Sequence, residues 1–340
     1  MKKIFLFICL TMIPLLGFAQ FVTKYPGIPR IDVHAHIDND YETIANYLLL
    51  RDRMMENNKL DLAMIINMNA EQAKDSVYEA SKGRIMATIN EYEPHRGLTH
   101  TPEEMATAVE KGFVGFKIWH GPSSRVLKEG EAGIRYFDDP AHEPVLAAME
   151  KAGLPIASVH IADPNGPFGN RGKWQADPVE FWRQVVGLER VVNRHPNLTI
   201  IAAHCAWLVC QDAQLDFLRY MLATYPNFHV DLAATFQYMH LLDHGNLRDF
   251  IIEYADRIVY GTDISRIRER DLPNFEARYA RTFRILETDE MVEGGFFGMN
   301  PVKGLNLPED VLEKIYITNA LKLYPGLKEN IVRLGYDKYK

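Results

Sequence analysis

Residues 31–36, IDVHAH, alternate apolar and polar side chains. Side chains in a β-strand point alternately to opposite faces, so the apolar residues share one face and the polar residues share the other. The apolar face suits a layer of helices, which leaves His34 and His36 directed to the interior of a parallel barrel near the end of its first strand. Two imidazoles one strand repeat apart can reach one metal ion. Alone, the pair is weak evidence for a metal site, and a pair of core or surface histidines is the alternative.

Seven further apolar runs alternate with longer amphipathic or charged stretches, the order typical of a parallel sheet covered by helices. The eight predicted strands span residues 31–36, 60–67, 85–90, 113–119, 155–160, 198–204, 228–233 and 257–262. Helix starts between them combine an N-cap residue, a proline and a glutamate, as in TPEE at 101–104. The pattern predicts an α/β fold, a (β/α)₈ TIM barrel.

The first twenty residues have the features of a secretory signal peptide. Lys2 and Lys3 precede an apolar run that ends in small residues. A membrane anchor is the alternative, but Pro14 interrupts the run, which is shorter than the ~20 residues that span a bilayer. We predict a signal peptide over 1–20, export to the periplasm or the medium, and one barrel domain over 21–340 without a membrane anchor.

Charge and cysteine content narrow the classes of partner. The chain of 340 residues has a formal net charge of −7, which becomes −9 when Lys2 and Lys3 leave with the signal peptide. This acidic balance does not favour nucleic acid or an anionic membrane. Only Cys205 and Cys210 follow the signal peptide, too few for a disulfide scaffold. We expect a small-molecule substrate, and the sequence leaves a homo-oligomer open.

Three more polar residues fall at the carboxyl ends of predicted strands. His160 ends the fifth strand, His204 ends the sixth, and Asp263 follows the eighth. In a (β/α)₈ barrel these ends converge on the face where the chemistry takes place. Satisfied core histidines are the alternative, but they would require three separate coincidences. The positions therefore predict a metal site built from histidine and aspartate.

These motifs resemble those of the amidohydrolase superfamily, and more narrowly the amidohydrolase-related branch that includes metal-dependent decarboxylases and lactonases. The resemblance rests on IDVHAH at 31–36, GFK at 115–117, VH at 159–160 followed by ADP at 162–164, AH at 203–204, and YGTD at 260–263. As an ordered set, they are specific for the superfamily and much less so for a substrate. The resemblance implies a TIM barrel of the metal-dependent hydrolase type.

The resemblance also assigns roles to the polar residues. It implies that His34, His36, His160 and Asp263 bind the metal, while His204 stays free to act on the substrate. One divalent ion is implied, with zinc favoured over manganese or iron. Bound zinc lowers the pKa of its water to about 7. Asp263 can accept a proton from that water, and His204 can polarise the scissile carbonyl or stabilise developing negative charge.

Lys117, on the fourth predicted strand, has three interpretations. Binuclear relatives hold a carboxylated lysine there that bridges two metals, whereas in the one-metal branch a lysine here would contact an anionic group of the substrate. A buried lysine paired with a carboxylate is the structural alternative. His120 follows closely and can reach the barrel mouth. Arg171 lies in segment 163–177, after the fifth strand, as a candidate for a lid or for a solvated loop.

Three functions fit these residues. The first is hydrolysis of an amide, lactone or ester in a small, carboxylate-bearing substrate by metal-activated water. The second is a lyase reaction, the non-oxidative decarboxylation or hydration of an unsaturated or aromatic acid, for which Lys117 and Arg171 could supply cationic groups. The third is a periplasmic binding protein without catalytic activity, which the presence of both His204 and Asp263 disfavours.

Overall fold

The protein is represented by a computed structural model that describes residues 21–121, 135–164, 178–294 and 298–340. The predicted signal peptide, residues 1–20, and Arg171 lie outside the described residues. Within these ranges, no helix combines the length and the apolar character needed to cross a membrane.

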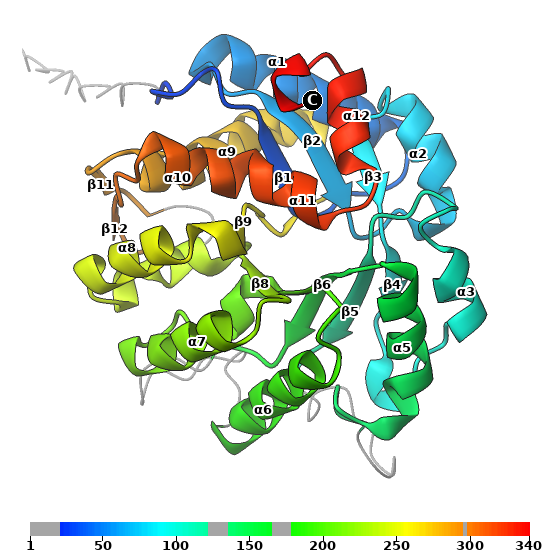
Figure 1. Ribbon diagram of the computed structural model, residues 1–340. Coiled ribbons are helices and arrows are strands. Elements are labelled where there is room, and N and C mark those ends of the chain that lie inside the picture. The colour runs from blue at the N-terminus through cyan, green and yellow to red at the C-terminus, as the bar shows by residue number, and fades with distance from the viewer. Residues whose placement is uncertain (1–20, 122–134, 165–177, 295–297) are drawn as a thin grey trace, which may run out of the picture.

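Strands and helices alternate along the chain, and the helices surround the strands (Figure 1). The barrel strands are β1 (Arg30–His36), β2 (Leu62–Asn67), β3 (Ile85–Ala87), β4 (Ile89–Glu91), β5 (Phe116–His120), β6 (Ile156–Ile161), β7 (Ile200–Ala202), β8 (Phe228–Asp231), β9 (Ile258–Val259) and β10 (Ile264–Ser265). The outer helices are α1 (Tyr41–Asn58), α2 (Lys74–Ala80), α3 (Pro102–Thr107), α5 (Glu143–Ala152), α6 (Pro178–Arg194), α7 (Asp212–Thr224), α8 (His244–Glu253) and α9 (Leu272–Glu287). Three short helices end the chain, α10 (Glu309–Glu313), α11 (Asn319–Leu323) and α12 (Leu327–Arg333), and a separate antiparallel pair joins β11 (Met291–Val292) to β12 (Val302–Lys303).

The barrel strands form a continuous circuit. Parallel pairing runs from β10 through β1 and β2 to β3, and from β4 through β5, β6, β7 and β8 to β9. β3 and β4 are two halves of the predicted third strand, and β9 and β10 are the two ends of segment 258–265. Tyr260, which lies between β9 and β10, accepts through its backbone O from Val33 N over 3.0 Å, so this segment is also hydrogen-bonded to β1. The eight strand segments therefore close into the predicted (β/α)₈ barrel.

The outer helices pack on the strands through apolar stripes. In α6, the buried positions include Phe181, Val185, Leu188 and Val192, at spacings of three and four residues. β1 is buried on both faces, as expected of a parallel strand covered by helices. The core therefore consists of the barrel interior and the layer between strands and helices.

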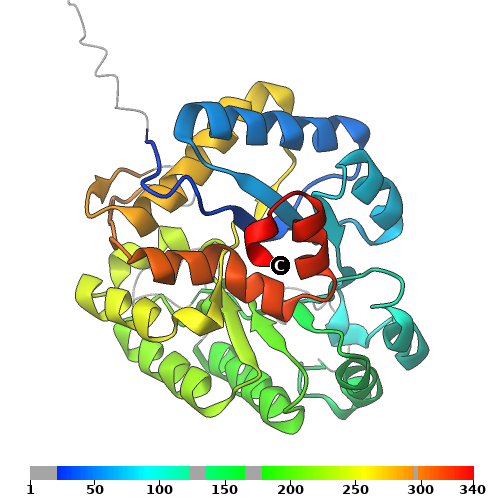
Figure 2. The same ribbon diagram turned by 45° about the horizontal axis from the view of Figure 1, so that its top comes forward.

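The C-terminal helices cover the amino ends of the strands, and Figure 2 shows α11 and α12 in red in front of the barrel. Asn330 Nδ2 in α12 donates to Gly83 O, shortly before β3, over 2.7 Å. Tyr324 OH, at the end of α11, donates to Ala157 O near the start of β6 over 3.2 Å. The predicted site residues lie at the opposite end, where the strands finish.

The sixth predicted strand, residues 198–204, is shorter than expected. β7 ends at Ala202, and residues 204–207 form a turn in which every φ lies between 52° and 58°. The left-handed conformation costs about 1–2 kcal/mol per non-glycine residue, and apolar periodicity does not reveal it. The prediction that His204 lies on the strand is wrong, although His204 still follows the strand's carboxyl end.

Candidate active site

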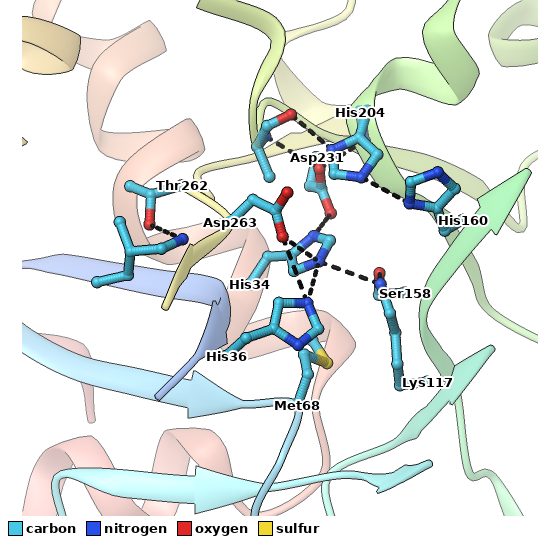
Figure 3. Close-up of polar contacts among 12 residues, drawn as sticks. His34, His36, Met68, Lys117, Ser158, His160, His204, Asp231, Thr262 and Asp263 are labelled. Carbon is cyan, nitrogen blue, oxygen red and sulfur yellow. Dashed lines mark hydrogen bonds and ion pairs between the residues drawn. The ribbon is translucent and has the colours of Figure 1, made fainter. Parts of the chain in front are cut away.

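Strand β1 carries His34 and His36 to the carboxyl end of the barrel, where their rings lie close together (Figure 3). The His34 side chain is fully buried, and 20% of the His36 side chain is exposed. The two Nε2 atoms are 3.2 Å apart. The strand alternation predicted from the sequence thus brings two imidazole nitrogens to one point.

Each of these rings is held through its other nitrogen. His34 Nδ1 lies 2.8 Å from Asp231 Oδ2, and His36 Nδ1 lies 3.2 Å from Asn69 Oδ1. The side-chain amide of Asn69 is oriented by its Nδ2–H group, which donates to His36 O over 3.0 Å. Because carboxylate and amide oxygens accept hydrogen bonds, both Nδ1 atoms carry the ring proton. Both Nε2 atoms therefore present lone pairs to the space between the rings.

Asp263 brings a carboxylate to the same place from the segment between β9 and β10. Its backbone is left-handed, with a φ of 64°, and its N–H donates to His34 O over 2.8 Å. Gly261 permits this close approach, because a Cβ there would lie 2.9 Å from His34 Cβ. Asp263 Oδ1 lies 3.3 Å from His36 Nε2 and 3.6 Å from His34 Nε2.

These three groups fit a divalent cation. The ligand atoms of His34, His36 and Asp263 all lie within 4.8 Å of one another. Imidazole and carboxylate ligands suit zinc, manganese and iron. Two lone pairs facing each other at this distance repel unless a proton or a cation lies between them. Burial, assisted by the charge of Lys117, lowers the pKa of His36 to about 3, so at neutral pH a cation is favoured over a shared proton.

Additional positive charge would also stabilise the ionised form of the Asp263 carboxyl group. Burial raises its pKa to about 7, Lys117 opposes this rise, and the carboxylates of Asp231 and Asp32 add to it. A nearby cation favours the ionised form of a carboxyl group and would lower the pKa again. The lone pairs and the carboxylate would therefore be stabilised together by one ion.

His204 lies beside His34, on the left-handed turn after β7. Its ring stacks on His34 at a centroid distance of 5.1 Å and on Trp207 at 4.3 Å. His204 Nδ1 lies 2.8 Å from Ala233 O, so this nitrogen carries the proton and Nε2 presents a lone pair. Burial, with a smaller contribution from His34, lowers the pKa of His204 to about 3. The neutral ring therefore offers Nε2 as a hydrogen-bond acceptor.

His160, on β6, pairs with His204. Its Nε2 donates to Ala162 O over 3.1 Å, which leaves the Nδ1 lone pair 3.0 Å from His204 Nε2. Among the described residues, the group of ligand atoms around Asp263 does not include His160. The geometry thus brings together three of the four ligands that the resemblance implies and places the fourth against His204.

Lys117, on β5, is fully buried inside the site. Its Nζ donates to His34 Nε2 over 3.1 Å and to Ser158 Oγ over 2.9 Å. Burial lowers the pKa of Lys117 to about 8, and the carboxylates of Asp263 and Asp231 oppose this shift. The ammonium group therefore lies within reach of any molecule that approaches His34.

Of the other two predicted residues, His120 is not brought to this point. His120 ends β5, and because it lies three positions after Lys117 it points to the opposite face of the strand. His120 Nε2 donates to Arg135 O over 2.7 Å, and its ring stacks on Tyr136. Arg171 lies outside the described residues, so its predicted role stays a prediction.

Sequence reasoning missed Asp231 and Asn69, which hold the two β1 histidines. Asp231 is the last residue of β8, and a carboxylate inside the predicted strand 228–233 is the signal that could have found it. Asn69 follows β2 by two residues. The pairing of each with its histidine depends on contacts between strands that are distant in the sequence, which no local pattern states.

Comparison with known proteins connects this site to a family. Residues 31–326 match the family model described as Amidohydrolase. Among solved structures, an uncharacterized TIM-barrel protein from Bordetella bronchiseptica is 14% identical over 91% of this chain and 100% of its own, with a TM-score of 0.50. Amidohydrolase 2 from Bifidobacterium longum subsp. infantis is 13% identical over 87% of this chain and 98% of its own, with a TM-score of 0.48. No curated protein sequence matches this chain.

The family match extends from the first residue of the IDVHAH motif to the loop before α12, so it contains His34, His36 and Asp263. The Bordetella bronchiseptica structure is distant in sequence and supports the barrel fold alone. The family and the grouped ligand atoms together support an enzyme that uses a divalent metal for hydrolase-type or lyase-type chemistry. The chain belongs to the amidohydrolase family.

Proposed function

We propose that this chain hydrolyses an amide, lactone or ester bond in a small, carboxylate-bearing substrate, with one zinc ion held by His34, His36 and Asp263. The observation that carries the proposal is the convergence of two histidine lone pairs and one carboxylate at the carboxyl ends of the strands, beside His204. We include His160 as a fourth ligand on the family resemblance alone.

A divalent ion held by His34, His36 and Asp263 would lower the pKa of a bound water and polarise a carbonyl group. Asp263 accepts a proton from the attacking water, whose oxygen adds to the carbonyl carbon. Asp263 then returns the proton to the leaving nitrogen or oxygen as the acyl bond breaks. Negative charge that develops on the carbonyl oxygen favours the protonated form of His204, so Nε2 would take a proton from solvent and donate a hydrogen bond to that oxygen.

Lys117 supports a substrate that carries a carboxylate. Its ammonium group is buried, and the partners that it contacts, His34 and Ser158, are neutral. A buried cation with neutral partners can form a strong, charge-assisted hydrogen bond to an anionic group. With a pKa of about 8, Lys117 is mostly protonated at neutral pH.

A substrate panel tests this proposal. Zinc-loaded protein should hydrolyse at least one member of a set of lactones, N-acylated amino acids and carboxylate-bearing esters, and the variants His204→Asn and Asp263→Asn should lose that activity. A parallel set of aromatic and unsaturated acids, followed by CO₂ release and by loss of the double bond, tests the lyase reaction. Lyase turnover without hydrolysis would replace the proposal, and ligand binding without turnover would favour a binding protein.

The number of ions can be measured separately. We propose one ion per chain, because both groups of candidate ligand atoms, His34–His36–Asp263 and His34–His204–Asp231, include His34. The Nδ1 of His34 is hydrogen-bonded to Asp231, so only its Nε2 is left for an ion. Metal analysis of the loaded protein should give one equivalent. Two equivalents, together with added mass on the Lys117 amine, would support the bridging interpretation instead.

We also propose that the chain is exported and cleaved before the barrel. This rests on Lys2, Lys3 and the apolar run that follows them. N-terminal sequencing of the exported protein should begin within a residue or two of Phe21. An intact Met1 in the membrane fraction would contradict export and cleavage.

A further inference from the structure

Asp231 is a fully buried carboxylate that contacts both halves of the site and has no role in the steps above. We propose that Asp231 is a positioning residue that sets the tautomer of His34 for metal binding and anchors the turn that carries His204. The inference rests on the proposed function in one respect, that His34 holds a metal ion.

The two carboxylate oxygens of Asp231 have different partners (Figure 3). Oδ2 accepts from His34 Nδ1 over 2.8 Å. Oδ1 accepts from the backbone N–H of His204 over 2.8 Å and from that of Ala233 over 3.0 Å. One side chain thus bonds the β1 histidine through one oxygen and the left-handed turn through the other.

The contact with Oδ2 decides which nitrogen of His34 is available. A carboxylate oxygen requires the proton on Nδ1, which leaves the Nε2 lone pair beside His36 and Asp263. In the opposite tautomer, an N–H on Nε2 would point to the His36 Nε2 lone pair 3.2 Å away. A hydrogen bond between the rings would then occupy the position that the ion requires.

The contact with Oδ1 decides where the His204 ring lies. Residues 204–207 adopt the left-handed conformation without a glycine, which costs about 1–2 kcal/mol per residue, so the turn persists only where its surroundings hold it. Asp231 Oδ1 accepts from the first N–H of the turn, that of His204, and the Cys205 thiol donates to Asp231 O over 3.3 Å. Asp231 therefore couples the position of His204 to that of His34.

The variant Asp231→Asn separates the effect of Asp231 on the His34 tautomer from its effect on the turn that carries His204. The amide oxygen must take the place of Oδ1, because two backbone N–H groups point there. The amide NH₂ then faces His34 Nδ1, which must become an acceptor and pass its proton to Nε2, where the hydrogen bond from Lys117 Nζ is lost. The turn and His204 should remain in place, while the lone pair for the metal is lost.

Metal affinity is the first measurement. Competition with a chelator should show that Asp231→Asn binds zinc 10-fold to 100-fold more weakly than the wild type, the usual effect of removing a carboxylate behind a metal-bound histidine. Asp249→Asn, the same substitution at an exposed position on α8, should bind zinc like the wild type. Wild-type affinity in a folded Asp231→Asn protein would overturn the inference.

The tautomer itself is the second measurement. It needs no activity, and its result on the wild type alone already tests the inference. In ¹⁵N NMR of the metal-free wild type, His34 should carry its proton on Nδ1, and in Asp231→Asn on Nε2, while His204 keeps Nδ1–H in both. A wild-type His34 protonated on Nε2 would overturn the inference even if the variant does not fold. If the wild type binds no divalent ion, the proposed function fails, whereas the NMR result still tests Asp231.

Discussion

Strand β1 has a buried polar cluster at each end, and the two clusters differ in how their atoms are matched. At the amino end, Arg30 donates to Glu287 Oε1 over 2.9 Å and to Thr23 Oγ1 over 2.8 Å. Its guanidinium also lies over the rings of Phe283 and Tyr316. Positive charge meets negative charge there, and donors meet acceptors except at Arg30 Nε, which is buried without a hydrogen-bond partner among the described residues.

At the carboxyl end, similar atoms face one another. The Nε2 lone pairs of His34 and His36 are 3.2 Å apart, and the lone pairs of His160 Nδ1 and His204 Nε2 are 3.0 Å apart. Lys117 Nζ donates to His34 Nε2 and offsets part of the first repulsion. Both ends of the strand are buried, so burial does not distinguish them. The difference teaches that matched partners indicate a structural cluster, whereas facing lone pairs indicate a place for an additional group.

The largest effect is expected at the carboxyl end, from Asp263→Asn. The substitution keeps the size of the side chain but removes the carboxylate that accepts a proton, so turnover should fall by roughly 10² to 10⁴. Zinc affinity should also weaken because a charged ligand is lost. Steady-state kinetics on the substrate found by the panel and chelator competition measure the two effects. Near-normal turnover would show that Asp263 is not the proton acceptor.

A second variant divides the carboxyl end into a ligand and a catalytic group. His204→Asn should remove most activity while zinc affinity stays near that of the wild type, because His204 is assigned to the substrate. Asparagine tolerates the left-handed conformation of this position, so the turn should survive. Loss of zinc from this variant would make His204 a ligand and reverse the assignment.

Substitutions in the cluster at the amino end of β1 should change the stability of the protein and leave zinc affinity unchanged. Arg30→Met leaves Glu287 buried without its cation, and breaking a buried ion pair costs about 3–5 kcal/mol. Denaturant unfolding measures the loss, with Arg270→Met at an exposed ion pair as the control. The double variant Arg30→Met with Glu287→Gln should recover part of it, and zinc affinity should not change in any of the three. A change in zinc affinity would show that the two ends are coupled.

Local patterns predicted the fold well because they are set by neighbouring residues. The alternation in residues 31–36 gives β1 within one residue at its start. The TPEE motif forms the predicted cap, in which Thr101 Oγ1 accepts from Glu104 N over 3.2 Å and Glu104 Oε2 accepts from Thr101 N over 2.7 Å. Both features depend on a few successive residues, so one sequence is enough to recognise them.

The site was predictable only in part, because its geometry depends on contacts between strands. The tips of the strands predict that His34, His36 and Asp263 lie at one face, and the structure brings them together. Strand position does not say which ring nitrogen carries a proton, since Asp231 and Asn69 decide that from β8 and from the loop after β2. It also does not show that His204 leaves the strand in a left-handed turn.

A smaller effect concerns a buried histidine that belongs to neither cluster. His229, in β8, is almost fully buried, and its Nδ1 lies 3.4 Å from Asn227 O. Burial, with the nearby charge of Arg257, lowers the pKa of His229 from 6.5 to about 4. Between these two pH values the unfolded chain binds more protons at this residue than the folded chain. The free energy of unfolding should therefore decrease as the pH falls from 6.5 to about 4, by roughly 3 kcal/mol from His229, with no further loss from it below that range.

Denaturant unfolding at several pH values should show a flatter slope for His229→Gln than for the wild type, and the difference between the two slopes removes the contributions of the other buried histidines. Equal slopes would mean that His229 is protonated as readily in the folded chain as in the unfolded one, and that a buried histidine with one weak partner does not resist a proton as those at the carboxyl end are expected to do.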